Sequence, residues 1–264
     1  MKRRTRLTFL VSLVNTGLVV FALNGSGNPS AQKSTSPKPA PSPHRPLPKP
    51  VGGARGFDQY AKHEASSRLV AGAATRGATD SASRRYEEGE VAYAAGEYQK
   101  AIEDFSESAR LSPNWAEAHY ALALSLTEMQ QLKAAIDEFK RVLKLKAKYG
   151  LMVLSNYNLG NAYADLGEYK EAIDAYKQAI ELNPELSEPH NNLGLAYAAS
   201  GQPAEAVAEL KAAVQLKPDF AAAHFNLGVA YLQSDQKHEA EGQLRILTKL
   251  DAEFASKLDA LIKQ

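Results

Sequence analysis

The sequence predicts an all-α fold, an α-solenoid of stacked helical hairpins preceded by a signal or anchor helix and a disordered linker. Three observations predict it. The tripeptide Asn-Leu-Gly recurs at 158–160, 192–194 and 226–228, each copy 34 residues after the last. Between the copies, apolar and small residues return at helical spacing, and Gly or Asn-Pro interrupts them. The content of hydrophobic residues is 44%, enough for a sizeable core.

Charge divides the chain into a basic head and an acidic body. Residues 1–80 carry 12 Lys/Arg against 3 Asp/Glu, a net charge of +9, whereas residues 81–264 carry 19 against 27, a net charge of −8. The total of +1 therefore indicates nothing about partners. There are no cysteines, which excludes disulfides, thiolate zinc sites and cysteine nucleophiles.

Residues 1–27 have the pattern of a signal peptide or membrane anchor. Four basic residues lie within the first six positions, and an apolar run of 17 residues follows from Leu7 to Leu23. This length lies between the two types of segment, so both remain open. In either case the sequence predicts export across the cytoplasmic membrane, to the periplasm or the outside, with residues 7–23 as the anchor if they are not cleaved.

Residues 28–80 are predicted to form a disordered linker rich in Pro, Gly and Ala. Eight of the chain's 13 prolines lie between Pro29 and Pro50, where few backbone donors and little apolar surface remain to support a fold. Residues 57–70 could add one marginal helix.

Five repeat units are predicted within residues 81–254, each of two helices. The units are 82–115, 116–149, 153–186, 187–220 and 221–254, with an insertion from Gly150 to Met152 before the third. Each helix has an apolar stripe that its own unit does not cover, so neighbouring units must cover it by stacking. Residues 255–264 continue the helical pattern and are expected to form a capping helix over the last unit.

These units resemble the tetratricopeptide repeat family over 173 of 264 residues. The third unit matches the family pattern of small, aromatic, alanine and proline positions at Gly160, Tyr163, Ala172, Tyr176, Ala179 and Pro184. The fifth unit departs from it, with Leu244, Leu247 and Ala252 where a ring, an alanine and a proline are usual. The resemblance implies a right-handed superhelix that binds peptides or partner proteins in a concave groove lined by the first helix of each unit.

The asparagines of the recurring tripeptide lie roughly 140° around the helix from the core-facing tyrosine, which places them off the packed stripe. A similar asparagine ladder grips peptide backbone in O-linked N-acetylglucosamine transferases. The alternative is that these amides pair with adjacent helices and recur only because the unit recurs. The candidate residues for binding a peptide or partner are Tyr86, Tyr120, Tyr157, Asn158, Asn161, Asn191, Asn192, Phe225 and Asn226.

The inferred groove carries carboxylates and no Lys or Arg. Its acidic residues are Glu87, Glu90, Glu117, Glu128, Asp165 and Glu188. This composition favours a neutral or basic extended peptide and lacks the lysine clamp of the family's heat-shock co-chaperones. The acidic body disfavours nucleic acid.

Catalysis and cofactors are not expected. His119, His190 and His224 occupy equivalent positions in their units, so repeat spacing keeps them apart and a metal site is not predicted. The common hydrolase and nucleotide-binding motifs are missing.

The sequence therefore predicts an exported or membrane-tethered scaffold that binds a protein or peptide in its groove. Two alternatives remain open: a self-associating structural protein with an empty groove, and an accessory subunit of an envelope or glycosyltransferase complex.

Overall fold

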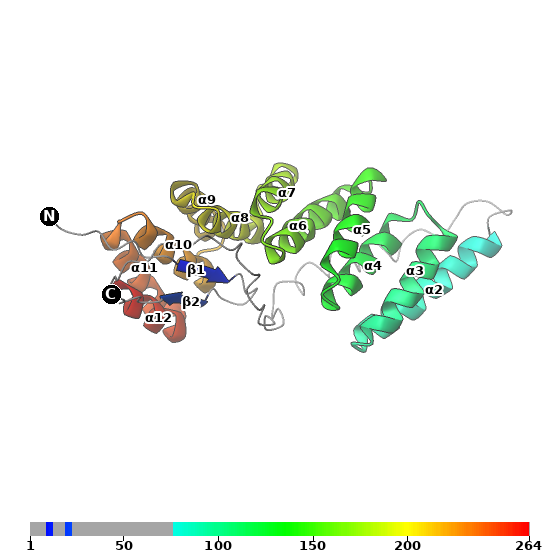
Figure 1. Ribbon diagram of the computed structural model, residues 1–264, viewed down its shortest axis with the longest axis horizontal. Helices are drawn as coiled ribbons and strands as arrows, with labels where there is room; N and C mark the ends of the chain where they lie inside the picture. The colour runs from blue at the N-terminus through cyan, green and yellow to red at the C-terminus, as the bar shows by residue number, and fades with distance from the viewer. Residues whose placement is uncertain (1–8, 13–18, 23–75, 264) are drawn as a thin grey trace, which may run out of the picture.

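Helical hairpins follow one another along a single long axis in the computed structural model, which describes residues 9–12, 19–22 and 76–263 (Figure 1). The first helices of the five hairpins are α2 (Arg76–Ala94), α4 (Ala116–Glu128), α6 (Tyr149–Asp165), α8 (Ser187–Ala199) and α10 (Ala221–Gln233). The second helices are α3 (Tyr98–Leu111), α5 (Leu132–Lys144), α7 (Tyr169–Leu182), α9 (Pro203–Leu216) and α11 (Lys237–Leu250), and α12 (Ala252–Ile262) follows them.

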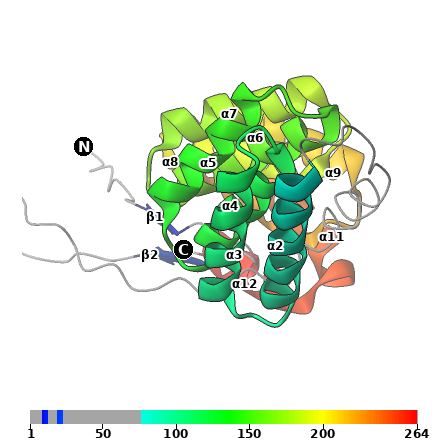
Figure 2. The ribbon, with the colours of Figure 1, turned by 90° about the vertical axis from the view of Figure 1, so that its right-hand side faces the viewer.

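The contacts between helices confirm the predicted α-solenoid. Each helix packs against its neighbours in chain order, and each first helix also touches the first helix of the next unit. The second helices of successive units make no contact of similar extent in the described part of the chain. Because the first helices are closer together than the second helices, they line the inner side of the curve. Figure 2 views the stack from the end at which α2 and α3 lie.

Close approach inside a unit depends on a glycine of the first helix. A Cβ at Gly160 would lie 2.5 Å from the ring of Tyr176 in the second helix, and a Cβ at Gly194 would lie 2.6 Å from Leu210. Gly89 and Phe105 form the same pair in the first unit. The small residue lets the ring or leucine fill the space between the two axes, as the repeat pattern predicts.

At the starts of two first helices, the predicted boundaries are wrong by part of a helix. α2 begins at Arg76, so residues 76–80 belong to the first hairpin and not to the linker. α6 begins at Tyr149, so the insertion from Gly150 to Met152 lengthens a first helix to 17 residues, where its counterparts α4, α8 and α10 have 13. Both differences have the same cause: once a helix is nucleated by packing, each further residue adds a backbone hydrogen bond at little cost.

The last unit closes differently from the others. Asp251 caps α12 by accepting hydrogen bonds from the backbone N–H groups of Glu253 and Phe254 at 2.9 and 3.0 Å, so this helix begins earlier than the predicted 255–264. Leu258 of α12 occupies the space beside Gly228, 2.6 Å from a Cβ placed there. In units one, three and four a residue of the second helix takes this place. The capping helix therefore completes the core of unit five as well as covering it.

Near the N-terminus the described residues are strands, where a signal or anchor helix was predicted. β1 (Phe9–Ser12) pairs antiparallel with β2 (Val19–Ala22), with Phe9 opposite Ala22. The β-branched and aromatic residues of this run suit a strand, and periodicity alone does not separate a short apolar strand from a helix. Among the described residues, no helix is both long and apolar enough to cross a membrane. The predicted linker up to residue 75 lies outside the described residues.

Candidate functional site

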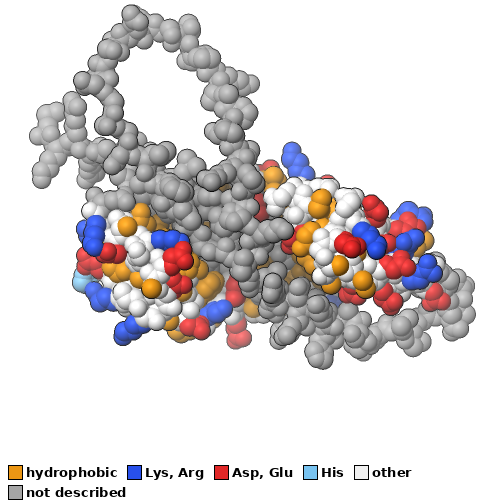
Figure 3. Space-filling view, turned by 90° about the horizontal axis from the view of Figure 1, so that it is seen from below, with side chains coloured by type: hydrophobic (Ala, Val, Ile, Leu, Met, Phe, Trp, Pro, Cys, Tyr) orange, Lys and Arg blue, Asp and Glu red, His pale blue; other side chains and the backbone are white. Residues whose placement is uncertain are grey.

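The inner side of the solenoid is built from the first helices, and their sequences differ sharply from those of the second helices. α4, α6, α8 and α10 contain no Lys or Arg at any position. By contrast, one second helix, α5, contains four basic residues: Lys133, Lys140, Arg141 and Lys144. On the surface seen in Figure 3, blue and red side chains stand next to one another at the α2 end of the solenoid. The first helices of units two to five therefore supply no Lys or Arg of their own. Lysines of the second helices do lie over their tyrosine rings, namely Lys140 over Tyr163, Lys177 over Tyr197 and Lys211 over Tyr231.

The aromatic residues predicted to line the groove pack against rings of the same unit's second helix or of the cap. The ring centroids lie 5.3 Å apart for Tyr86 and Phe105, 5.8 Å for Tyr120 and Phe139, and 6.2 Å for Tyr157 and Tyr176. Phe225 stacks at 5.2 Å on Phe254 of α12. The rings of Tyr86, Tyr120 and Tyr157 therefore pack between the two helices of a hairpin, and that of Phe225 packs against the capping helix α12. Burial raises the pKa of Tyr157 to about 12, so its hydroxyl stays neutral at physiological pH.

The asparagine ladder joins consecutive first helices by one repeated hydrogen bond. Each asparagine amide donates to a side chain of the previous unit. The acceptor residue lies one position before the residue that is equivalent to the asparagine in that unit. The three bonds are Asn158 Nδ2 to the Tyr120 hydroxyl at 3.0 Å, Asn192 Nδ2 to the Tyr157 hydroxyl at 3.2 Å, and Asn226 Nδ2 to Asn191 Oδ1 at 2.9 Å. The amides pair with adjacent helices, which was the alternative to an open ladder.

The expectation that the whole ladder lies off the packed stripe is corrected by the burial of Asn192 and Asn226. Asn191 is buried as well, whereas Asn158 and Asn161 remain partly accessible. The physical reason is that a first helix has three packed sides: one against its own second helix and one against each neighbouring first helix. A rotation of 140° around the helix moves the asparagine away from the side that packs on its own second helix. It then lies on a side that packs on a neighbouring first helix.

Unit three adds a local network around Asn161. Its Oδ1 accepts hydrogen bonds from the Tyr176 hydroxyl at 2.8 Å and from Asn192 Nδ2 at 2.9 Å. Asn191 Nδ2 in turn donates to Asn192 Oδ1 at 3.0 Å. The amides of Asn226, Asn191 and Asn192 therefore donate one to the next, and the chain ends on Asn161.

Two buried acceptors on α10 have no partner. They are Asn226 Oδ1, at the head of the amide chain, and Gln233 Oε1, seven residues later on the same face of the helix. An unpaired buried acceptor is destabilising by about 1–3 kcal/mol. The sequence prediction missed Gln233. It occupies in unit five the repeat position that Asp165 occupies in unit three, so the phase of the repeat could have indicated it.

Asp165 is an inner-face carboxylate whose pKa is shifted by its surroundings. It is exposed at the end of α6, but protein atoms surround it on most sides, and this partial desolvation raises its pKa to about 6. Glu117 and Glu188 stand at the starts of their helices and are paired with lysines of the loops, with Lys148 at 3.6 Å and Lys217 at 3.5 Å. The middle of the inner face is therefore negative at neutral pH.

The three equivalent histidines tie each hairpin to the loop before it. In all three, Nδ1 lies 2.6–2.7 Å from a side-chain oxygen of the second helix, Glu138, Glu209 or Gln243. Nε2 lies 2.9–3.3 Å from the carbonyl of the proline six residues earlier. In unit one, Arg85 takes the same position and contacts Asp104 at 2.9 Å. In the described residues no three metal-binding side chains come together, and the histidines act as structural links.

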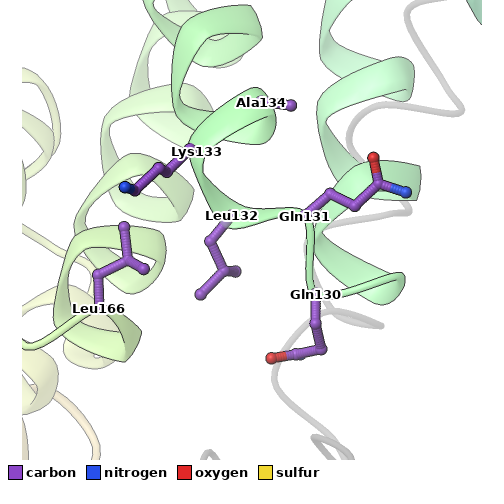
Figure 4. Close-up of a pocket in the computed structure, with 6 residues that line it drawn as sticks. All are labelled: Gln130, Gln131, Leu132, Lys133, Ala134 and Leu166. Carbon is purple, nitrogen blue, oxygen red and sulfur yellow. The ribbon is translucent and has the colours of Figure 1, made fainter. Parts of the chain in front are cut away.

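A shallow depression lies at the turn between α4 and α5, away from the predicted site (Figure 4). It is lined by Gln130, Gln131, Leu132, Lys133, Ala134 and Leu166, with Lys133 on the side of Leu166. Gln130 adopts a left-handed backbone with φ of 58°, where the corresponding turns of units one, three and four have glycine. The depression follows from this turn and brings together no group that indicates a ligand.

Comparison with known proteins agrees with this architecture. A family model described as "Tetratricopeptide repeat" matches residues 86–150, and a model described as "TPR repeat" matches residues 160–201 and 195–235. A curated relative, Small glutamine-rich tetratricopeptide repeat-containing protein 2 of Mycosarcoma maydis, is 32% identical over 97 residues, which are 37% of this chain and 27% of the relative. The chain thus spans about a quarter of that relative's length.

Solved structures with the same fold include MamA and YrrB. The structure of MamA from residue 41 to its end, from Desulfovibrio magneticus RS-1, superposes with a TM-score of 0.61 at 23% identity, over 65% of this chain and 96% of MamA. YrrB, described as a TPR protein with an unusual peptide-binding site, superposes with a TM-score of 0.59 at 20% identity, over 79% of this chain and all of YrrB. At these identities the likeness establishes the fold alone.

Proposed function

The chain belongs to the tetratricopeptide repeat family, and from that premise we propose that it is an interaction scaffold whose inner face holds an extended segment of a partner protein. The observation that carries the proposal is the set of four consecutive inner helices without a single cation, joined side by side by their amides. A continuous surface of this kind can take a ligand longer than one unit. YrrB, which has the same fold, is described as binding peptide.

The partly accessible amides and the carboxylate of the middle units supply the recognition. Asn158 and Asn161 are accessible enough to reach a ligand, and Asp165 adds negative charge one turn beyond Asn161. Tyr120, Tyr157, Asn191, Asn192 and Phe225 support this surface from behind, through the contacts described above. We propose a binding role rather than a catalytic one.

The test is a panel of 12-residue peptides that differ in charge, measured by fluorescence anisotropy with the full chain. Asp165→Lys places a cation on the inner face at an exposed position, so the fold should tolerate it and binding should fall about 10-fold or more. Asp174→Lys makes the same charge change at an exposed position of α7 and should leave binding unchanged. Absence of binding to every peptide, or equal loss in both variants, would refute the inner face as the binding site.

We also propose that the scaffold works outside the cytoplasm. The support is the run of basic and then apolar residues from Lys2 to Leu23, the pattern of a signal or anchor segment. Mass spectrometry of the chain purified from its own cell envelope identifies the mature N-terminus. A protein recovered only from the cytoplasmic fraction with residues 1–27 intact would overturn this proposal.

Self-association remains the competing role, because stacking edges of two copies could join. Light scattering across a range of concentrations separates the two roles. Monomers that persist at high concentration while peptide binds support the scaffold, whereas dimers that form without ligand and exclude peptide favour assembly.

A further inference from the structure

One of the two unpaired acceptors of α10, Gln233 Oε1, belongs to a column of acceptors that runs across the solenoid. Gln233 in unit five, Asp165 in unit three and Glu128 in unit two occupy the same repeat position, and unit four has Ala199 there. Each of the three residues ends a first helix on the inner side. The repeat thus places oxygen acceptors at matching points of three of the four cation-free helices.

The amide chain explains why Asn226 is left with a free acceptor and not with a free donor. Asn226 uses its N–H group on Asn191, Asn191 uses its own on Asn192, and Asn192 donates to Asn161. Because every bond in the chain points the same way, the first amide keeps a free oxygen, and Asn226 is only 3% exposed. Both Asn226 Oδ1 and Gln233 Oε1 are buried, so a ligand reaches them only after the side chains around them shift, and it must then offer donors and not acceptors.

The spacing of the column limits the conformation of the ligand. Packed helices lie about 8–10 Å apart, so equivalent positions in successive units are separated by about that distance. Three residues of a polyproline II segment advance about 9.3 Å and return to the same side of the segment. A segment in this conformation can therefore present one side chain to each unit.

From these observations we propose that the ligand is a basic, polyproline II segment of a partner protein with a Lys or Arg at every third position, its cations lying along Glu128, Asp165 and Gln233. This inference rests on the proposed function, since it specifies the chemistry of the same face. The cation-free first helices admit such a segment without repulsion. The chain's own basic tract places Lys33, Lys38, Arg45 and Lys49 at intervals of five, seven and four residues, which does not match the column.

The test uses three labelled 15-residue probes with the full chain. The probes are (Lys-Pro-Ala)5, a block peptide of the same composition with its five lysines together, and (Glu-Pro-Ala)5. We expect the first probe to bind at least about 5-fold tighter than the block peptide, and the acidic probe not to bind. Equal binding of the first two probes would overturn the spacing while leaving peptide binding intact. Failure of all three, together with the wider peptide panel, would overturn the proposed function itself.

Gln233→Met removes the acceptor and keeps the size of the side chain. Because the acceptor is unpaired in the free protein, the melting temperature should stay the same or rise, while affinity for (Lys-Pro-Ala)5 falls about 3–10-fold. Asp165→Asn should weaken the same probe, and Asp174→Asn on α7 is the matched control. Unchanged affinity in Gln233→Met would remove α10 from the site. If replacing the four basic residues of the chain's own tract by Ala raised affinity about 5-fold or more, that tract and not a partner would be the occupant.

Discussion

Replacing Tyr176 tests the packing of the third hairpin and the amide network together. Its ring is 1% exposed and fills the space beside Gly160, so Tyr176→Ala should lower the free energy of unfolding by about 3–5 kcal/mol through the cavity that remains. Tyr176→Phe keeps the ring and removes only the hydroxyl that donates to Asn161. Since Asn161 Oδ1 still accepts from Asn192, no acceptor is orphaned, and the cost should be about 0.5–1.5 kcal/mol.

Urea unfolding followed by circular dichroism measures both variants, and hydrogen exchange of α6 and α7 checks whether unit three opens separately from its neighbours. Tyr149→Ala is the control, because Tyr149 is 56% exposed and should cost less than about 0.5 kcal/mol. A cost below about 1 kcal/mol for Tyr176→Ala, or one equal to the control, would refute the packing described for the hairpin.

Three further changes test single contacts. Gln130→Gly relieves a left-handed backbone and should raise the free energy of unfolding by up to about 1 kcal/mol; a loss would show that the turn is not strained. Asp251→Ala removes the cap of α12 and should cost about 1 kcal/mol in urea unfolding, with faster hydrogen exchange confined to the last helix. The third concerns His119, whose pKa is raised chiefly by its hydrogen bond to Glu138, so its stabilising contribution is complete below the unfolded pKa of about 6.5 and is lost as pH rises through the folded value. Glu138→Gln should therefore lower the melting temperature more at pH 5.5 than at pH 8, and an equal effect at both would contradict the link.

The solenoid was predictable because the forces that build it recur with the repeat. Gly160 and Gly194 each meet a large residue of the second helix, at the same phase of the repeat. Boundaries were less predictable where a segment occurs once. The start of α2 at Arg76 and the start of α6 at Tyr149 depend on how far a packed helix extends, which no repeated residue marks.

The candidate site was predictable in position and less so in detail. The residues expected on the inner side do belong to adjoining first helices, but Asn192 and Asn226 face a neighbouring helix and are buried. A rotation angle measured within one helix carries no information about the helix beside it. Leu258 entering the space of unit five shows the same limit, because a contact supplied from outside the repeat has no counterpart in the pattern.

The amide chain joins stability to recognition. An apolar contact between first helices would leave no polar atom unpaired. The chain of amide hydrogen bonds has a direction, because each amide donates to the next, and so the oxygen of the first amide, Asn226, has no donor. That acceptor is destabilising in the free protein by about 1–3 kcal/mol, and a donor from a ligand recovers this energy only in the complex. We therefore expect a bound basic segment to slow hydrogen exchange in α10 and in α12 packed on it, relative to α2. Protection spread evenly over all five units would indicate that the ligand acts through charge alone.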